Sequence, residues 1–331
     1  MTSQRATQPA LGARAIAWLL AIAWPLVFGA LWFLGQRFLD LRSVAAQPGP
    51  GHAVEQIHHV HGLAMDPQDT TVLYVATHEG LLRYREGKGL EYVGEVRSDF
   101  MGFTHHPAKA GLLFASGHPH PSDNATNPLG VIVSADGGKT WRTLGLEGQV
   151  DLHAMTIRKT DGVVLYGWNV MSEPGLYKIS TSDAKATLIG AKALGQVYAL
   201  AAHPTQPGTL LAGTGRGLFA SEDEGQSWKP LTNDLRGVPV TVADWHPKNA
   251  AVLYAYAARA DLGFIMSEDG GKTWKPLGWF LGDRDAVGSL AISPHDPQRL
   301  FAATYGNDLL RSVDGGRTWA PLVKQGKPVA P

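Results

Sequence analysis

Short apolar runs alternate with polar turns along the chain from residue 58 onward. Six repeats each open with a first strand, expected at 61–67, 101–107, 153–159, 198–204, 241–247 and 288–294. A brief polar turn and a second strand follow, expected at 73–78, 113–118, 165–170, 210–215, 253–258 and 300–305. Few charges interrupt these runs, which is typical of buried inner strands. The period of about 45 residues predicts an all-β fold, a six-bladed β-propeller with four-stranded blades over residues 58–323.

An eight-residue motif recurs in four of the repeats. Its copies read SADGGKTW, SEDEGQSW, SEDGGKTW and SVDGGRTW, and they begin at Ser134, Ser221, Ser267 and Ser312. The Asp can accept backbone N–H groups within a tight turn, Gly supplies a positive φ, and Trp anchors the next strand. We therefore expect the four motif aspartates to be structural: Asp136, Asp223, Asp269 and Asp314.

The amino-terminal part of the chain differs from the repeats. Residues 15–35 form a run of 21 residues without a charge, which is long enough to cross a bilayer as a helix. We expect a tail at 1–14, a transmembrane signal anchor at 15–35, a linker at 36–57 and a short tail at 324–331, with the propeller outside the cytoplasm. A signal peptide cleaved near 43–45 is the alternative, disfavoured because charged residues separate that site from the apolar run.

Composition excludes some functions. The chain has no cysteine, so disulfides and thiolate metal sites are excluded. Lys plus Arg and Asp plus Glu each number 29, so no net field attracts nucleic acid, and no nucleic-acid partner is expected.

The propeller topology sorts the histidines onto two faces. In each blade the first strand begins, and the second strand ends, on the near face beside the axis, whereas the turn between them lies on the far face. The far turns contain His106, His203, His246 and His295, which we interpret as polar turn residues.

The near face of the first three blades gathers possible metal ligands. They come from the starts of first strands, the ends of second strands and one position just upstream: His59, His61, His78, Met101, His118 and His153. The next two blades have Asp99 and Asp151 at the position that His59 occupies in the first. We predict that the six residues converge on one metal ion at the axial mouth. Imidazole with thioether favours copper, and the nearby carboxylates keep zinc and iron as alternatives.

A simpler interpretation of the same residues stays open. The mouth would then be polar and filled with water, and each histidine would bond to a neighbour or to solvent. Met65 and Met155 lie within the first strands, away from their starts, and are expected to be core residues.

The repeated motif resembles the Asp-box (BNR) repeat of sialidases, sortilin and photosystem assembly propellers. The segments HVHGLAMDP, ATHEG, DFMGF, SGHP and DLHAM resemble membrane-anchored bacterial propellers that are often labelled glycosyl hydrolases, some of them associated with copper handling. This resemblance extends over residues 58–322 and implies a single-pass protein of the bacterial cytoplasmic membrane with its propeller in the periplasm.

The sequence suggests three candidate functions. The first is metal binding, for copper handling or delivery. The second is a platform for a protein partner on the propeller face, as in the assembly propellers. Glycoside hydrolysis ranks third, because no blade begins with the Arg that a sialidase-like site requires and only Asp99 and Asp151 offer a carboxylate pair. We therefore favour a binding protein over an enzyme.

Overall fold

The computed structural model describes residues 49–190 and 192–329. The expected tail at 1–14, the signal anchor at 15–35 and most of the linker lie outside these ranges. Within the described residues, no helix combines the length and the apolar character that a membrane crossing requires.

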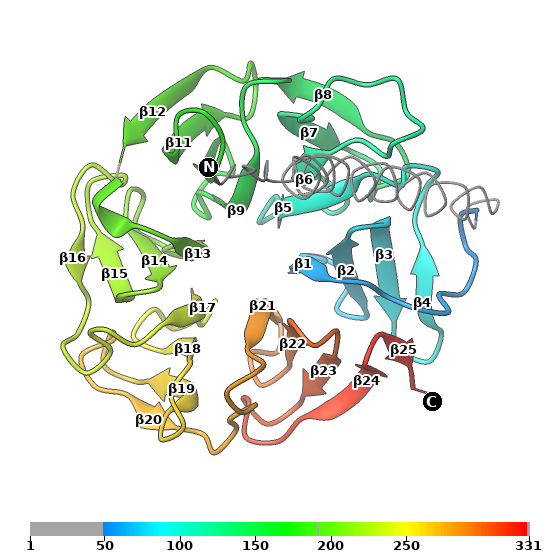
Figure 1. The fold of residues 1–331 in the computed structure, drawn as a ribbon. Helices are drawn as coiled ribbons and strands as arrows, with labels where there is room; N and C mark the ends of the chain where they lie inside the picture. Colours follow the sequence, from blue (N-terminus) through cyan, green and yellow to red (C-terminus); the bar gives the residue numbers. More distant parts are fainter. Residues whose placement is uncertain (1–48, 191, 330–331) are drawn as a thin grey trace, which may run out of the picture. The chain divides into compact units, whose positions relative to one another are not determined.

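Six antiparallel sheets surround a central axis (Figure 1). Blade 1 comprises β1 (Val60–Met65), β2 (Val72–Thr77), β3 (Gly80–Arg85) and β4 (Gly89–Tyr92). Blade 2 comprises β5 (Asp99–His105), β6 (Leu113–His118), β7 (Val131–Ser134) and β8 (Arg142–Gly145). Blade 3 comprises β9 (Leu152–Ile157), β10 (Val164–Asn169), β11 (Gly175–Ser180) and β12 (Ala186–Gly190).

The second half of the ring repeats this plan. Blade 4 comprises β13 (Val197–Ala202), β14 (Leu210–Thr214), β15 (Gly217–Ser221) and β16 (Lys229–Pro230). Blade 5 comprises β17 (Val240–Trp245), β18 (Leu253–Ala257), β19 (Gly263–Ser267) and β20 (Lys275–Pro276). Blade 6 comprises β21 (Val287–Ile292), β22 (Leu300–Thr304), β23 (Leu309–Ser312), β24 (Ala320–Lys324) and β25 (Lys327–Pro328). The predicted six-bladed propeller is confirmed, and the one helical element in the described ranges is the three-residue η1 (Lys192–Leu194).

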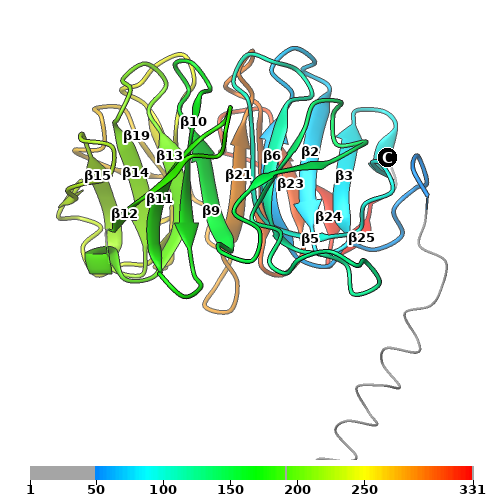
Figure 2. The same cartoon turned by 90° about the horizontal axis from the view of Figure 1, so that it is seen from above.

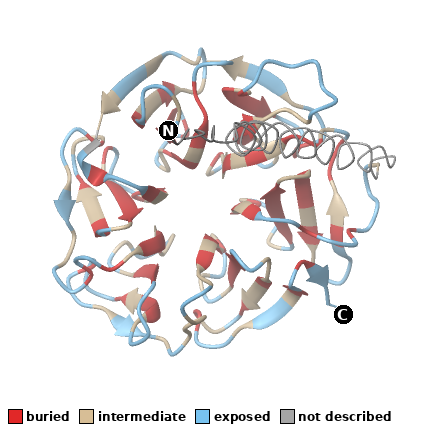
Figure 3. Ribbon diagram, viewed as in Figure 1, coloured by how far each residue is buried: buried red, intermediate tan, exposed pale blue. Residues whose placement is uncertain are grey.

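The first strand of every blade lies nearest the axis, and the later strands lie progressively farther out (Figures 1 and 2). The second strands β2, β10, β14, β18 and β22 are buried along their whole length. Figure 3 shows burial concentrated in the inner strands and exposure in the outermost ones. Apolar side chains of neighbouring blades pack together: Phe100 and Phe103 of blade 2 lie in one cluster with Leu81 of blade 1.

The tight turn predicted for the repeated motif is observed. In its first copy Ser134 Oγ donates to Asp136 Oδ1 at 2.8 Å, and Thr140 donates its backbone N–H to the same oxygen at 3.0 Å. Thr140 Oγ1 donates to Asp136 Oδ2 at 2.6 Å, and Trp141 Nε1 donates to the Gly138 carbonyl at 3.2 Å. The other three copies repeat this pattern. These hydrogen bonds fix the turn between the third and fourth strands.

Histidine also fixes the far-face turns. His203 Nδ1 accepts the backbone N–H groups of Thr205 and Gln206 at 3.1 and 3.0 Å. His106 and His246 do the same in their own blades. Their assignment as turn residues is confirmed.

The ring closes between blades 6 and 1 with help from both ends of the described chain. The backbone N–H of Ile57 donates to the Gly326 carbonyl at 2.7 Å, and Val54 and Ile57 are buried in the cluster that joins these blades. Strand β25 lies within residues 324–331, where a tail was expected. The last blade therefore continues past residue 323 because β24 and β25 form a hairpin that pairs Val323 with Pro328.

Candidate metal centre

Every first strand contains a β-bulge near its start, beside the axial mouth. In blade 1, Val60 pairs with Thr77 and Gly62 pairs with Ala76, so His61 between them is the extra residue. The same irregularity leaves one extra residue in each of the other blades: Met101, His153, Tyr198, Thr241 and Gly288. A bulge re-aims a side chain without ending the sheet, so the six bulged residues sit at equivalent places around the mouth.

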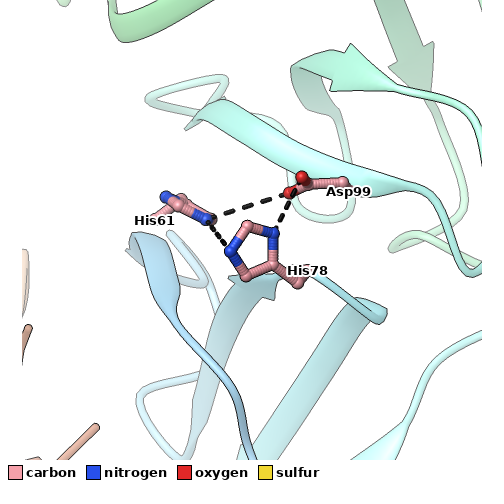
Figure 4. Close-up of side chains that lie close together, drawn as sticks. All are labelled: His61, His78 and Asp99. Carbon is pink, nitrogen blue, oxygen red and sulfur yellow. Dashed lines mark hydrogen bonds and ion pairs between the residues drawn. The ribbon is translucent and has the colours of Figure 1, made fainter. Parts of the chain in front are cut away.

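One of the bulged residues, His61, forms a compact group with His78 of blade 1 and Asp99 of blade 2. Single ligand atoms of His61, His78 and Asp99 all lie within 4.8 Å of one another (Figure 4). His61 Nε2 is 3.4 Å from His78 Nε2 and 3.8 Å from Asp99 Oδ1. Ligand atoms about 3.4 Å apart are what bonds of about 2.05 Å give in a tetrahedral metal site. The group therefore needs little adjustment to hold an ion.

Asp99 orients His78. His78 Nδ1 lies 2.8 Å from Asp99 Oδ2, so Nδ1–H donates to the carboxylate and the Nε2 lone pair faces His61. A carboxylate that fixes the tautomer of a histidine in this way is common behind metal ligands. The other oxygen, Asp99 Oδ1, is buried and has no hydrogen-bond partner among the described residues. A buried acceptor without a donor is costly, and a cation beside it removes the cost.

His61 is held in the form that binds metals. Burial, together with the neighbouring His78, lowers the pKa of His61 to about 4, although Asp99 opposes the shift. The ring is therefore neutral near pH 7, and the neutral imidazole is the metal-binding form.

His59 stands beside the group. Its ring centroid lies 5.0 Å from that of His78 and 6.2 Å from that of His61. The backbone of His59 is left-handed, with φ of 45°, and Asn307 Oδ1 accepts its N–H at 2.9 Å. Non-glycine residues in this conformation are uncommon and cluster at functional sites.

The remaining predicted histidines meet around a different carboxylate. His153 Nε2 lies 2.9 Å and His118 Nε2 lies 3.4 Å from Asp151 Oδ2. The Asp151 side chain is only 6% exposed. Four of the predicted residues thus lie in two pairs, His61 and His78 beside Asp99 and His118 and His153 beside Asp151, while His61, Met101 and His153 line one cavity. Their convergence on one metal ion stays a prediction.

Met101 faces the cavity at the mouth. That cavity has a volume of about 560 Å³, and His61, Met101 and His153 line it together with Trp168, Tyr198 and Tyr305. Below it an axial channel of about 360 Å³ is lined by all six first strands. Met65 and Met155 are buried in apolar clusters, as expected.

Asp99 and Asp151 were not among the six ligands predicted from the sequence. The signal for them was present, because the repeat places both at the position that His59 occupies in the first blade. A carboxylate at that position reaches the histidine of the preceding blade, which requires knowing how the blades pack.

No family model matches this chain, and no curated protein matches it. Solved structures do share its fold. The GH74 xyloglucanase from Xanthomonas campestris aligns with a TM-score of 0.56 and 21% identity over 82% of this chain and 46% of its own. The GH74 enzyme of Niastella koreensis aligns with a TM-score of 0.60 and 16% identity over 83% of this chain and 47% of its own.

A structure of YCF48 bound to D1 peptide aligns with a TM-score of 0.51 and 16% identity, over 84% of this chain and 87% of its own. This chain spans less than half the length of the two GH74 chains. At these identities the likeness is one of fold. By its fold, this chain is similar to the β-propellers of GH74 enzymes and of YCF48.

Proposed function

We propose that this protein is a metal-binding propeller that holds a transition-metal ion at His61, His78 and Asp99. One observation carries the proposal: a buried, unpartnered carboxylate oxygen lies beside two imidazoles whose nitrogens are 3.4 Å apart. His59 stands close enough to complete the ligand set.

Copper is the proposed ion. Imidazole and carboxylate ligands accept zinc, iron or copper, and among divalent ions Cu²⁺ binds such ligands most tightly. Met101 on the same mouth adds a soft thioether, which suits Cu⁺. An ion held there would be accessible from the mouth, since the side chain of His78 is 37% exposed, and such access would suit uptake and release in copper handling.

We also propose that residues 15–35 tether the propeller to the bacterial cytoplasmic membrane on its periplasmic side. The proposal rests on the uncharged run of 21 residues. A copper-binding mouth on that side would meet copper entering the periplasm.

The test is metal analysis of the full chain, purified in detergent with a tag that contains no histidine. We expect copper to bind the wild type and the His61→Ala/His78→Ala variant to lose at least one equivalent. The control is His52→Ala/His120→Ala, which removes two histidines that form local hydrogen bonds, His52 with the Gly49 carbonyl and His120 with Ser122. If the His61→Ala/His78→Ala variant kept the full copper content of the wild type, the proposed site would be wrong.

A protein-interaction platform is the second candidate, and one observation favours it. The YCF48 structure, which covers nearly the same span, contains a bound peptide. A partner that binds equally well to wild type and to the metal-free variant would support this candidate. Hydrolysis is less well supported, because Asp99 and Asp151 each contact two imidazoles, as ligands or orienting groups do.

A further inference from the structure

The axial channel extends well beyond the proposed metal site. It has a volume of about 360 Å³ and reaches from His61, at the near-face mouth, to Lys159, beyond the far-face end of β9. Its walls are mostly apolar or small side chains, among them Leu63, Phe103 and Leu200. A cavity of this size, with apolar walls and a few convergent polar groups, is the usual form of a binding site for a small organic molecule.

One first strand departs from the repeat at the far end of this channel. Five of the six repeats place proline at the seventh position of the first strand, and the third has lysine there: Pro67, Pro107, Lys159, Pro204, Pro247 and Pro294. Lys159 Nζ donates to Asp244 Oδ1 at 2.7 Å, so the pair connects blade 3 to blade 5 past the strand of blade 4 that lies between them. Among the described residues that line the channel, Lys159 and Asp244 are the two with acidic or basic carboxylate, ammonium or guanidinium groups.

This ion pair leaves hydrogen-bonding groups free. An ammonium group has three N–H donors, and one of those of Lys159 is used by Asp244. Asp244 Oδ1 also accepts the backbone N–H of Trp245 at 2.8 Å, whereas Oδ2 accepts no hydrogen bond from a described residue. Both side chains are 27% exposed and line the channel, so a molecule in the channel can reach these groups. A partly desolvated ion pair is stabilised when its remaining donors and acceptors are satisfied.

His105 adds a neutral acceptor to the channel wall. Its Nδ1 lies 3.1 Å from the His106 carbonyl oxygen, which can only accept, so Nδ1 carries the hydrogen and Nε2 the lone pair. Burial lowers the pKa of His105 to about 4, although the hydrogen bond to His106 opposes the shift, so the ring is neutral near pH 7. The charges of Lys159 and Asp244 act on this pKa in opposite directions, which places the ring close to the pair.

We propose that the axial channel binds a small zwitterion with an apolar tail, of the α-amino acid kind. The free N–H groups of Lys159 suit a carboxylate, and Asp244 Oδ2 and His105 Nε2 suit an ammonium group. Because the charges of Lys159 and Asp244 cancel, a ligand without net charge adds no uncompensated charge to the cavity, whereas a simple anion or cation would. The tail would lie along the apolar walls toward the mouth.

The test is isothermal titration of the full chain in detergent with three probes that share one tail: L-leucine, 4-methylpentanoate and 3-methylbutylamine. The protein is first dialysed against a chelator, because a bound metal would itself capture an amino acid. We expect L-leucine to bind at least about tenfold more tightly than the acid or the amine, each of which meets only one of the two charges.

Two variants locate the binding. Lys159→Met keeps the length of the side chain and removes its charge, so the affinity for L-leucine should fall at least about tenfold. Lys159→Met/Asp244→Leu removes both charges and leaves no unpaired one, so it should keep the wild-type thermal midpoint and still fail to bind L-leucine. The matched control is Lys275→Met/Glu268→Gln, which removes an ion pair of the same 2.7 Å length from the exposed surface and should bind L-leucine as the wild type does.

The outcomes decide between a ligand site and a purely structural ion pair. If L-leucine bound no better than the acid and the amine, or bound the folded double variant as well as the wild type, the proposal would be wrong, and the pair would only close the channel. Absence of binding by all three probes would have the same meaning. The copper content of Lys159→Met should equal that of the wild type, so the result does not depend on the proposed metal site.

Discussion

Histidines on the two faces of this propeller do different work, although the residue type is the same. On the far face, His106, His203 and His246 each use Nδ1 to accept two backbone N–H groups of their own turn. On the near face, His61 and His78 face each other and a carboxylate from the next blade. The far-face rings are satisfied by their turns, whereas Asp99 Oδ1 on the near face is buried and finds no hydrogen-bond donor among the described residues. The hydrogen-bond partners of a histidine, more than the residue type, therefore distinguish a structural histidine from a metal ligand.

The largest expected effect tests the near face. Asp99→Asn keeps the size of the side chain and an acceptor for His78 but removes the charge, so the copper affinity of the site at His61, His78 and Asp99 should fall about 100-fold. Competition with a chelator of known affinity measures the loss. Asp123→Asn, in an exposed loop, is the matched control and should change nothing. An unchanged copper affinity in Asp99→Asn would contradict the contrast between the two faces, because the charge of Asp99 would then contribute nothing to metal binding.

The next effect tests the far face. His203→Ala removes the acceptor for two backbone N–H groups and a ring that packs 5.0 Å from Trp245, so stability should fall by about 2 kcal/mol. His203→Asn offers a carbonyl oxygen in place of Nδ1 and should recover part of the loss, much as Asp66 serves the same turn in blade 1. Chemical unfolding gives the values, and copper content should stay at the wild-type level. A loss of copper in His203→Ala would mean that the far-face turn affects metal binding at the near face.

A smaller effect is expected for the repeated motif. Asp136→Ala removes the acceptor for the Ser134 and Thr140 hydroxyls and for one backbone N–H, in a turn that is largely open to solvent. We expect a loss of about 1 kcal/mol in the free energy of unfolding. Copper binding should persist, and its selective loss with intact stability would contradict a structural role.

The smallest effect is a pH dependence of the far face. Burial, with Lys159 adding to it, lowers the pKa of His203 below its usual value of about 6.5. The unfolded chain then binds the proton more readily than the folded chain, so the contribution of His203 is complete above that value and declines as the pH falls below it. Unfolding measured at pH 7.5 and pH 5 should show a larger acid loss for the wild type than for His203→Asn. Equal losses would assign the pH dependence to other groups.

The repeated pattern predicted the fold well because it is redundant. Four copies of one turn and six matched strand pairs report the same period, so no single residue decides the architecture. The same topology assigned His106, His203 and His246 to the far-face turns, where the structure places them. The near-face residues needed more, because Asp99 and Asp151 reach across a blade junction and the bulges arise from strand pairing, which leaves no local mark in the sequence.

The repeat pattern also did not predict where the propeller begins and ends. Residues 324–329 carry no repeat signal, yet β25 pairs there because the chain folds back on β24. Ile57 and Val54 read as linker residues and are buried only because blades 6 and 1 meet beside them. Contacts that occur once in a repeat protein cannot be found by comparing its repeats.

The six bulges have a consequence for how such a protein can change over time. Each bulged residue, from His61 to Gly288, stands outside the pairing of its strand, so its identity contributes little to the sheet. Substitutions at the partly exposed members of this set can therefore alter what the mouth binds while the blades keep their stability. Thr241 and Gly288 are more constrained, because Thr241 is buried with its Oγ1 donating to the Val287 carbonyl at 2.6 Å and a Cβ at Gly288 would meet the Tyr305 ring. His, Met, Tyr, Thr and Gly already occupy the six places in this one chain. Single substitutions at the bulged residues could therefore give the mouth new binding specificities one residue at a time, while the protein stays folded at every step.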